Sequence, residues 1–174
     1  GGTNWTTTNL TVDGTAISIT DVDASTVTSV QIQVLDAAGN AGATETQAIT
    51  YDAAVPTVTI ASIDSITEDS DDATADFTTN QATVTVAATL STALLTGEVA
   101  QYSVDGGTNW TSTTPSGTAI SITGVDASTV TSIKIQVLDA AGNAGTTATQ
   151  AITYDATVPT VTIASIDSVT EDAD

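Results

Sequence analysis

The chain has 174 residues, a formal net charge of −20 at pH 7, a single cation at Lys134, and neither histidine nor cysteine. Nucleic acids and anionic membrane surfaces are excluded as partners, because both bind basic protein surfaces. The lack of cysteine excludes disulfides, thiolate metal sites and thiol nucleophiles. Hydrophobic residues make up 40% of the chain and charged residues only 13%, so the composition is that of a folding domain rather than a disordered acidic tail.

The chain repeats itself. Residues 14–69 and 117–172 align without a gap at an offset of 103 and differ at only seven of 56 positions. This period exceeds the 20 to 50 residues of solenoid units and approaches the roughly 100 residues of an immunoglobulin-like domain. We therefore expect three parts: the C-terminal half of one repeat in residues 1–55, a complete repeat in 56–158, and the start of the next in 159–174.

The first of these parts has no counterpart of residues 56–101. Without those strands we expect it not to bury a core alone. If it is ordered, a neighbouring molecule or a swapped segment must supply the missing strands.

Apolar residues alternate with polar ones through most of the complete repeat, as at Val84 and Val86 or at Ile133, Ile135 and Val137. Such alternation predicts half-buried antiparallel strands, and no segment has a helical period. The predicted strands cover residues 57–63, 82–88, 100–104, 109–113, 118–123, 130–138 and 147–154. The sequence therefore predicts an all-β protein of tandem immunoglobulin-like antiparallel β-sandwiches joined end to end by short linkers.

Acidic residues concentrate in the predicted loops, and strand direction assigns each loop to one end of the sandwich. Seven acids are expected at the end where the last strand finishes: Asp64, Glu68, Asp69, Asp71, Asp72, Asp126 and Asp155. The opposite end has Asp139 and Asn143, and the preceding half-repeat contributes Asp21, Asp23 and Asp52. Each junction between domains is thus expected to collect acids from two repeats.

Two interpretations of these acids are open. Carboxylates about 4 Å apart repel by roughly 1 to 4 kcal/mol per pair at effective dielectric constants of about 80 to 20, and a cation removes this repulsion. Calcium binds six to eight oxygens, whereas transition metals favour the histidine and cysteine that this chain lacks. Alternatively, the acids are solvated charges that keep the protein soluble. We favour calcium, because solubility alone gives no reason for acids to gather at the ends of domains.

The segments PTVTIASIDSITED, DGGTNW and VLDAAGNAG resemble the extender repeats of giant RTX adhesins, the bacterial immunoglobulin-like domains of ice-binding and biofilm adhesins of marine bacteria. The resemblance covers essentially the whole chain. It implies a sandwich repeated many times, export by type I secretion to the bacterial cell surface, and calcium at and near the junctions. By motif, this calcium-binding character maps onto Asp52, Asp64, Glu68, Asp69, Asp139, Asn143 and Asp155, and the third part reuses Asp167, Glu171 and Asp172.

The expected function is that of a structural extender, rigidified by calcium between neighbouring repeats of the same polypeptide and projecting a distal adhesive domain. The alternative is a carbohydrate- or surface-binding sandwich in which Trp5 or Trp110 stacks on a sugar, although a lone tryptophan on a short strand more often packs. An enzyme is disfavoured, because a catalytic serine would lack its usual base. No apolar run is long enough to cross a membrane.

Overall fold

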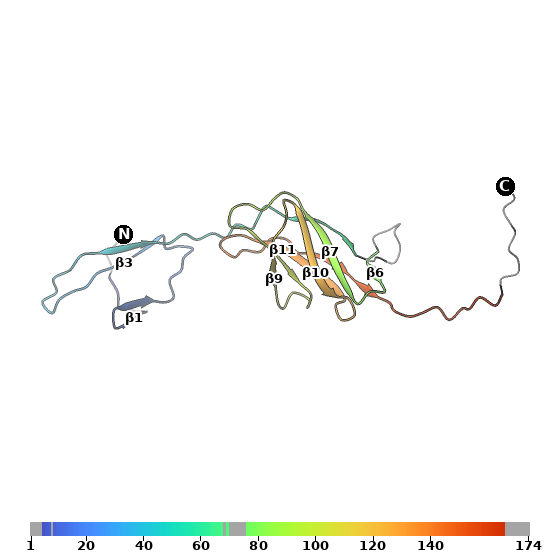
Figure 1. Ribbon diagram of the computed structural model, residues 1–174. Coiled ribbons are helices and arrows are strands. Elements are labelled where there is room, and N and C mark those ends of the chain that lie inside the picture. Colours follow the sequence, from blue (N-terminus) through green and yellow to red (C-terminus); the bar gives the residue numbers. More distant parts are fainter. Residues whose placement is uncertain (1–4, 8, 68, 70–75, 166–174) are drawn as a thin grey trace. The chain divides into compact units, whose positions relative to one another are not determined.

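The computed structural model describes residues 5–7, 9–67, 69 and 76–165 (Figure 1). The described residues form strands, turns and loops, with no helix among them. The chain divides into two compact units, which we name unit 1 (Gly1–Ala53) and unit 2 (Ala54–Asp174). The boundary between them lies close to the predicted one at residues 55 and 56.

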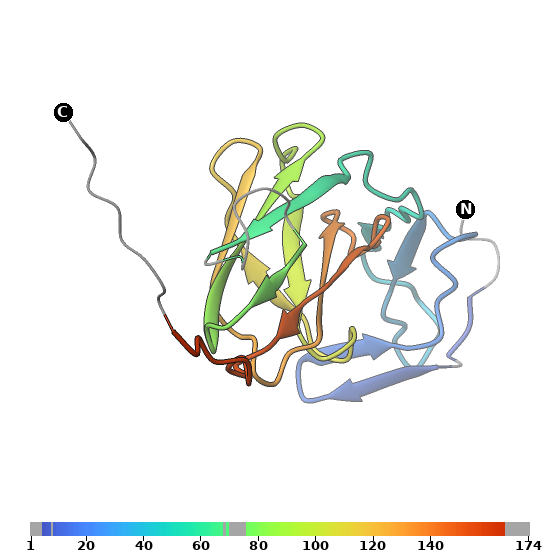
Figure 2. The ribbon, with the colours of Figure 1, turned by 90° about the vertical axis from the view of Figure 1, so that its right-hand side faces the viewer.

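Unit 2 is built from two antiparallel sheets (Figure 2). The first has the order β10-β7-β5 and consists of β10 (Ala119–Asp126), β7 (Thr83–Leu90) and β5 (Ile60–Ile66). The second has the order β12-β11-β8-β9 and consists of β12 (Ala148–Ala151), β11 (Ser132–Leu138), β8 (Val99–Ser103) and β9 (Thr111–Thr113). A short parallel pair joins β6 (Thr78–Thr79) to β13 (Thr153–Tyr154).

The core of unit 2 lies between these sheets and is formed by the predicted alternation. Every second residue of β7 is buried, including Val84 and Val86. From the other sheet, Ile133, Ile135 and Val137 of β11 belong to the same buried cluster. Because both sheets supply one core, the arrangement is consistent with a β-sandwich.

All seven predicted strands occur in unit 2, with ends that differ by a few residues. The first predicted strand, 57–63, is found at Ile60–Ile66. The last is divided into β12 and β13, because Thr153 leaves the second sheet and its N–H donates to the carbonyl of Phe77 at 2.9 Å. The pairing of β13 with β6 was not predicted.

Unit 1 consists of two hairpins. One joins β1 (Leu10–Asp13) to β2 (Ala16–Ile19), and the other joins β3 (Ser29–Ile32) to β4 (Glu45–Ala48). None of its described residues is buried. Unit 1 alone therefore builds no core, as expected from its missing strands.

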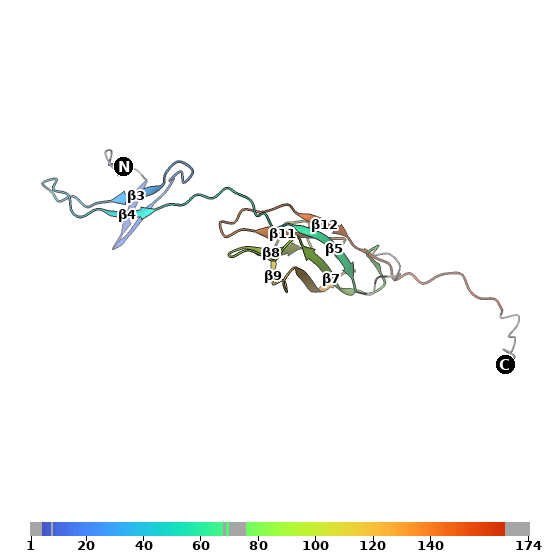
Figure 3. The same ribbon diagram turned by 90° about the horizontal axis from the view of Figure 1, so that it is seen from above.

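Within unit 2, the chain enters the sandwich formed by β5 to β13 at one end and leaves it at the opposite end (Figure 3). Where it enters, Pro56 packs against Gly145 in the β11–β12 loop, with its Cβ and Cγ 3.8 Å from the position that a Cβ on Gly145 would take. Where it leaves, the N–H of Asp155 donates to the carbonyl of Thr79 at 2.9 Å. The β11–β12 loop and Asp155 thus mark the two ends of unit 2.

Candidate calcium-binding residues

At the end where the chain leaves unit 2, Asp69 is the predicted ligand with an unusual environment. Its Oδ2 accepts a hydrogen bond from the backbone N–H of Phe77 at 3.2 Å. Its Oδ1 is buried and has no hydrogen-bond partner among the described residues. A buried carboxylate oxygen without a donor is costly, and a bound cation is one way to satisfy it.

Asp126 and Asp155 belong to the same end, and both carboxylates accept local hydrogen bonds. Asp126 ends β10 and accepts from the hydroxyl of Ser128 at 2.5 Å and from its N–H at 3.1 Å. Chiefly because of that hydroxyl, the pKa of Asp126 is lowered from its ordinary value. The pKa of Asp155 is lowered by the backbone N–H of Thr157, which donates to it at 2.8 Å. Both groups therefore stay ionised and use some of their oxygen lone pairs within the chain.

The predicted loop position of Asp64 is wrong. The residue lies within β5, which continues to the buried Ile66. Its Oδ2 accepts from the hydroxyl of Thr89 on β7 at 2.7 Å, and its Oδ1 accepts from the hydroxyl of Ser62. The strand extends because Ile66 continues the apolar pattern into the core, so Asp64 is an exposed group on a sheet.

At the opposite end, the loop from Asp139 to Asn143 is ordered by its own hydrogen bonds. The Oδ1 of Asp139 accepts from the N–H of Ala141 at 2.9 Å and from that of Asn143 at 2.8 Å. The Nδ2 of Asn143 donates to Oδ2 at 2.8 Å and is the main cause of the lowered pKa of Asp139. The Asn143 amide thus contacts the carboxylate with its nitrogen, the end that cannot ligate calcium.

The Asp-x-x-x-Asn spacing also occurs at Asp105 and Asn109, which we did not predict as a functional pair. The N–H of Asn109 donates to Asp105 Oδ1 at 2.9 Å, and its Nδ2 donates to Oδ2 at 2.6 Å. These bonds, the backbone one first, lower the pKa of Asp105 to about 2. The shared spacing of DGGTN and DAAGN in the sequence was the available signal for this loop type.

In unit 1, Asp23 repeats the arrangement of Asp126. It accepts from the hydroxyl of Ser25 at 2.6 Å and from its N–H at 3.0 Å, and its pKa is lowered chiefly by that hydroxyl. Asp21 has a positive φ of 57°. Asp52 is exposed and follows β4.

The predicted ligands are not gathered into one site in the part of the chain that the structure describes. Within residues 5–7, 9–67, 69 and 76–165, no three acidic side chains lie close enough together to hold a metal ion. Several predicted ligands lie outside the described residues, namely Glu68, Asp71, Asp72, Asp167, Glu171 and Asp172. The calcium assignment therefore stays a prediction, for which Asp69 offers the most suitable oxygen.

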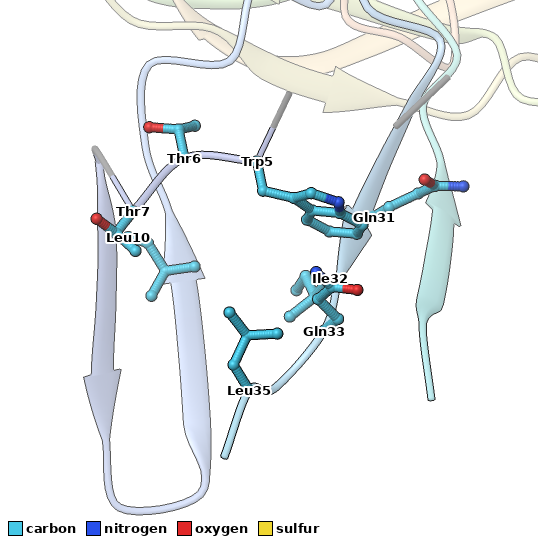
Figure 4. A pocket seen from close by; sticks show the side chains of 8 residues that line it. All are labelled: Trp5, Thr6, Thr7, Leu10, Gln31, Ile32, Gln33 and Leu35. Atoms are coloured by element: carbon cyan, nitrogen blue, oxygen red, sulfur yellow. The ribbon is translucent and has the colours of Figure 1, made fainter. Parts of the chain in front are cut away.

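The two tryptophans differ in their surroundings. Trp110 is half-buried, and its Nε1–H donates to the carbonyl of Gly107 at 3.0 Å. Trp5 is 46% exposed and, with Leu10, Ile32 and Leu35, borders an open hollow of about 590 Å³ in unit 1 (Figure 4). In the complete repeat the tryptophan thus packs with its polar atom satisfied, whereas in unit 1 it lines an open hollow together with apolar and polar side chains.

No helix in the described ranges is long and apolar enough to span a membrane. No protein-family model matches the chain, and no curated protein matches it.

Proposed function

We propose that the chain is part of a structural extender, a row of immunoglobulin-like repeats that holds a distal adhesive domain away from a bacterial cell surface. The observation that carries this proposal is the path of the chain through unit 2, which enters at Pro56 against Gly145 and leaves at Asp155 beside Thr79. A domain with its two connections at opposite ends can be joined in series, and each added copy lengthens the row. The near-identity of residues 14–69 and 117–172 suits this role, because a spacer needs many equivalent modules.

Strand length gives the reach of one module. The eight residues of β7 span roughly 26 Å at about 3.3 Å per residue, before loops and linkers are added. The linker from Asp52 to Pro56 contains a proline and no glycine, which favours a stiff connection. A row of such modules would extend an adhesive domain far beyond the other molecules at the surface.

Calcium is the proposed stabiliser of this row. The chain carries 21 acidic residues against one basic residue, and its compact units must overcome this self-repulsion. The buried Oδ1 of Asp69 supports a cation at the end where each repeat finishes. Calcium that binds only the folded state adds about 2.7 kcal/mol per site at a hundredfold excess over its Kd.

The extracellular location, the export by type I secretion and the partnership with neighbouring repeats are proposed with this function. They rest on the resemblance of the repeat segments to RTX adhesin extenders. The half-buried Trp110 of the complete repeat does not favour the carbohydrate-binding alternative.

The test combines small-angle scattering with thermal melting of the 174-residue chain. Both are measured in millimolar calcium, and again in EGTA with magnesium restored. We expect calcium to raise both the melting temperature and the maximum dimension, and magnesium to restore neither. If neither the maximum dimension nor the melting temperature changes with calcium, the calcium part of the proposal is contradicted.

Single carboxylates can then be assigned with variants of equal charge. Asp69→Asn and Asp52→Asn should each reduce the calcium-dependent rise in melting temperature or dimension. Asp13→Asn, on the β1–β2 hairpin and outside the predicted ligands, removes the same charge and should leave the calcium response intact. An equal loss in all three variants would show a general charge effect in place of defined sites.

A further inference from the structure

Two aspartates of the chain are followed directly by glycine, Asp13 by Gly14 and Asp105 by Gly106. In such a pair the backbone nitrogen of the glycine can attack the side-chain carboxyl carbon of the aspartate, because glycine has no Cβ that obstructs the approach. The attack requires a carboxyl group that can turn toward this nitrogen. It also requires the protonated carboxyl, since one oxygen has to leave as water.

The first pair forms the exposed turn of the β1–β2 hairpin. Asp13 is the last residue of β1 and pairs with Ala16 across the turn. Asp13 and Gly14 are both exposed. Among the described residues, none makes a hydrogen bond to the Asp13 carboxylate or to the Gly14 N–H. Both reacting groups are therefore accessible and unrestrained.

The complete repeat has the same turn, so its shape does not depend on the surroundings of unit 1. The counterpart of the Asp13–Ala16 pair is Ser116 with Ala119, which exchange backbone hydrogen bonds at 2.8 and 3.1 Å. The glycine of the turn has a φ of 64° at Gly117 and of 60° at Gly14. Ser116 and Gly117 are exposed although unit 2 has a core. The first residue of the turn therefore decides whether the turn can react.

The carboxylate of the second pair is held in place by hydrogen bonds. Asp105 accepts from the hydroxyl of Ser103 at 2.8 Å and from the N–H of Thr108 at 3.0 Å. The N–H and the side-chain amide of Asn109 donate to both of its oxygens, at 2.6 to 3.1 Å. To turn toward the nitrogen of Gly106, the carboxylate has to give up these bonds.

The backbone after Asp105 is held as well, and the carboxylate stays ionised. The carbonyl of Gly106 accepts from the Nζ of Lys134 at 2.8 Å. The hydrogen bonds of Asn109, the backbone one first, lower the pKa of Asp105 to about 2. Above pH 3.8, the neutral acid is therefore roughly tenfold to a hundredfold scarcer than it is at the ordinary pKa. Both requirements of the attack are disfavoured at Asp105.

We propose that Asp13 is a site of spontaneous isoaspartate formation and that the hydrogen bonds of Asp105 protect the second Asp–Gly pair from the same reaction. The Gly14 nitrogen forms a bond to Cγ of the protonated Asp13 carboxyl, and the carboxyl hydroxyl leaves with the amide proton as water. A water molecule then adds to the main-chain carbonyl carbon of the resulting cyclic imide and breaks the bond of this carbon to the Gly14 nitrogen. The chain now continues through Cβ and Cγ of Asp13, the main-chain carbonyl has become a carboxylate, and the product is an isomer of the original chain.

The isomer has one additional methylene group in the backbone of the turn. The pairing of Asp13 with Ala16 cannot keep its geometry across the longer connection, so the hairpin loosens at this end. Ser116 has no carboxyl group and cannot react in this way. Repeats that differ at this position therefore differ in the lifetime of the turn.

The test is incubation of the 174-residue chain in mildly acidic buffer with EGTA. Peptic digestion and mass spectrometry with electron-transfer fragmentation then distinguish isoaspartyl from aspartyl residues. A parallel sample in concentrated urea gives the reactivity of each pair in the unfolded chain. After each rate is divided by its rate in urea, we expect Asp13 to convert at least about tenfold faster than Asp105.

Variants assign the difference to single residues. Asp13→Ser, which introduces the residue of the complete repeat, should abolish the conversion at the turn and leave that of Asp105 unchanged. Asn109→Ala and Lys134→Gln each remove a hydrogen bond of the Asp105 loop and should accelerate the conversion of Asp105. Asn80→Ala is the matched control, because Asn80 is exposed and lies outside that loop. Melting curves verify that each variant is folded during the incubation.

Three results would each overturn the proposal. The first is that Asp13 and Asp105 convert in the folded chain at the same fraction of their rates in urea. The second is that folding suppresses conversion at Asp13 altogether. The third is that the folded variants of the Asp105 loop convert Asp105 no faster than Asn80→Ala does.

Discussion

Residues 14–53 and 117–156 are nearly the same sequence in two environments, and their side chains differ sharply in exposure. Ile17 is 44% exposed in unit 1, whereas its counterpart Ile120 is 2% exposed in unit 2. Val34 is 70% exposed, and its counterpart Val137 is 1% exposed. The immediate sequence neighbours of Val34 are the same as those of Val137. Burial is therefore decided by the strands that cover a segment and not by the segment itself.

The Asp-x-x-x-Asn loop, in contrast, has the same hydrogen bonds in both units. Asp36 Oδ1 accepts from the N–H groups of Ala38 and Asn40 at 2.9 and 2.8 Å. These are the distances found at the counterpart Asp139. The glycine of each loop has a positive φ, 87° at Gly39 and 93° at Gly142. Hydrogen bonds within five residues form this loop without help from a core.

Strand pairing is the same in the two units for one hairpin and differs for the strand before it. The hairpin of β3 and β4 keeps the register of β11 and β12. The strand before it changes its partner, since β10 pairs with β7 whereas its counterpart β2 pairs with β1. Pairing within this hairpin is thus the same with and without a core, whereas pairing between segments distant in sequence differs between the two units.

The largest expected effect is on matched core residues. Ile135→Ala should destabilise unit 2 by roughly 2 to 5 kcal/mol, because the side chain is fully buried and its removal leaves a cavity. Ile32→Ala, at the counterpart position, should cost well below 1 kcal/mol, because that side chain has no core around it. Denaturant unfolding followed separately by the amide NMR signals of unit 2 and of unit 1 measures the two effects. Equal losses of stability in the two variants would contradict the structure, because they would mean that Ile32 also lies in a core.

A smaller effect is expected at a backbone position where, among the described residues, the two units use different residue types with positive φ. Gly124 has a φ of 74° inside the irregular pairing of β10 with β7, and its counterpart Asp21 has a φ of 57°. Gly124→Ala should cost about 1 kcal/mol, because an L side chain is strained there. Gly124→Asp should cost less than Gly124→Ala, since aspartate tolerates this conformation better than alanine.

Thermal melting of unit 2 measures both substitutions at Gly124. Ser121→Ala is the control, because Ser121 is an exposed position of the same strand. If Gly124→Ala has the same melting temperature as Ser121→Ala, the positive φ costs no stability and the argument from backbone strain is wrong.

These contrasts explain how much of the molecule the sequence could predict. Alternation located all seven strands of unit 2, because each buried position recurs at every second residue, as at Val84 and Val86. The position of Asp64 was mispredicted, because the strand end depends on the burial of Ile66 across the sandwich. The β6–β13 pair joins segments far apart in sequence and carries no local signal. The hydrogen bonds of Asp139 were missed because this acid was interpreted as a ligand, and those of Asp105 were not predicted at all, although the Asp-x-x-x-Asn spacing of both was visible.

A third prediction concerns the loops, where the two units should respond alike. Asp36→Ala and Asp139→Ala each remove the acceptor of two backbone N–H groups, those of Ala38 and Asn40 or of Ala141 and Asn143. Amide hydrogen exchange at these four positions should accelerate by a similar factor in both variants. A clearly smaller acceleration in unit 2 would show that its core holds the loop independently of the carboxylate.

The smallest effect is on the pH dependence of single carboxylates, and it tests whether their pKa values have a local origin. The side-chain amides of Asn40 and Asn143 are the main causes of the lowered pKa values of Asp36 and Asp139. Carboxyl chemical shifts should therefore give nearly equal midpoints below 3.8 for the two residues, whatever the difference in their surroundings. Asp105 should titrate lower, at about 2.

A folded-state pKa below that of the unfolded chain stabilises the fold above the unfolded value, and this contribution is lost as the pH falls through the folded value. For Asp105 the loss should lie between pH 3.8 and about 2. Asp105→Asn should remove that part of the pH dependence of unit 2 melting, while Asp13→Asn, a carboxylate on the β1–β2 hairpin of unit 1, should leave it in place. A midpoint for Asp139 well above that of Asp36 would mean that burial near the core of unit 2 disfavours the charged carboxylate. The geometry of the loop would then depend only on its local hydrogen bonds, whereas the pKa of its carboxylate would also depend on the strands that cover it.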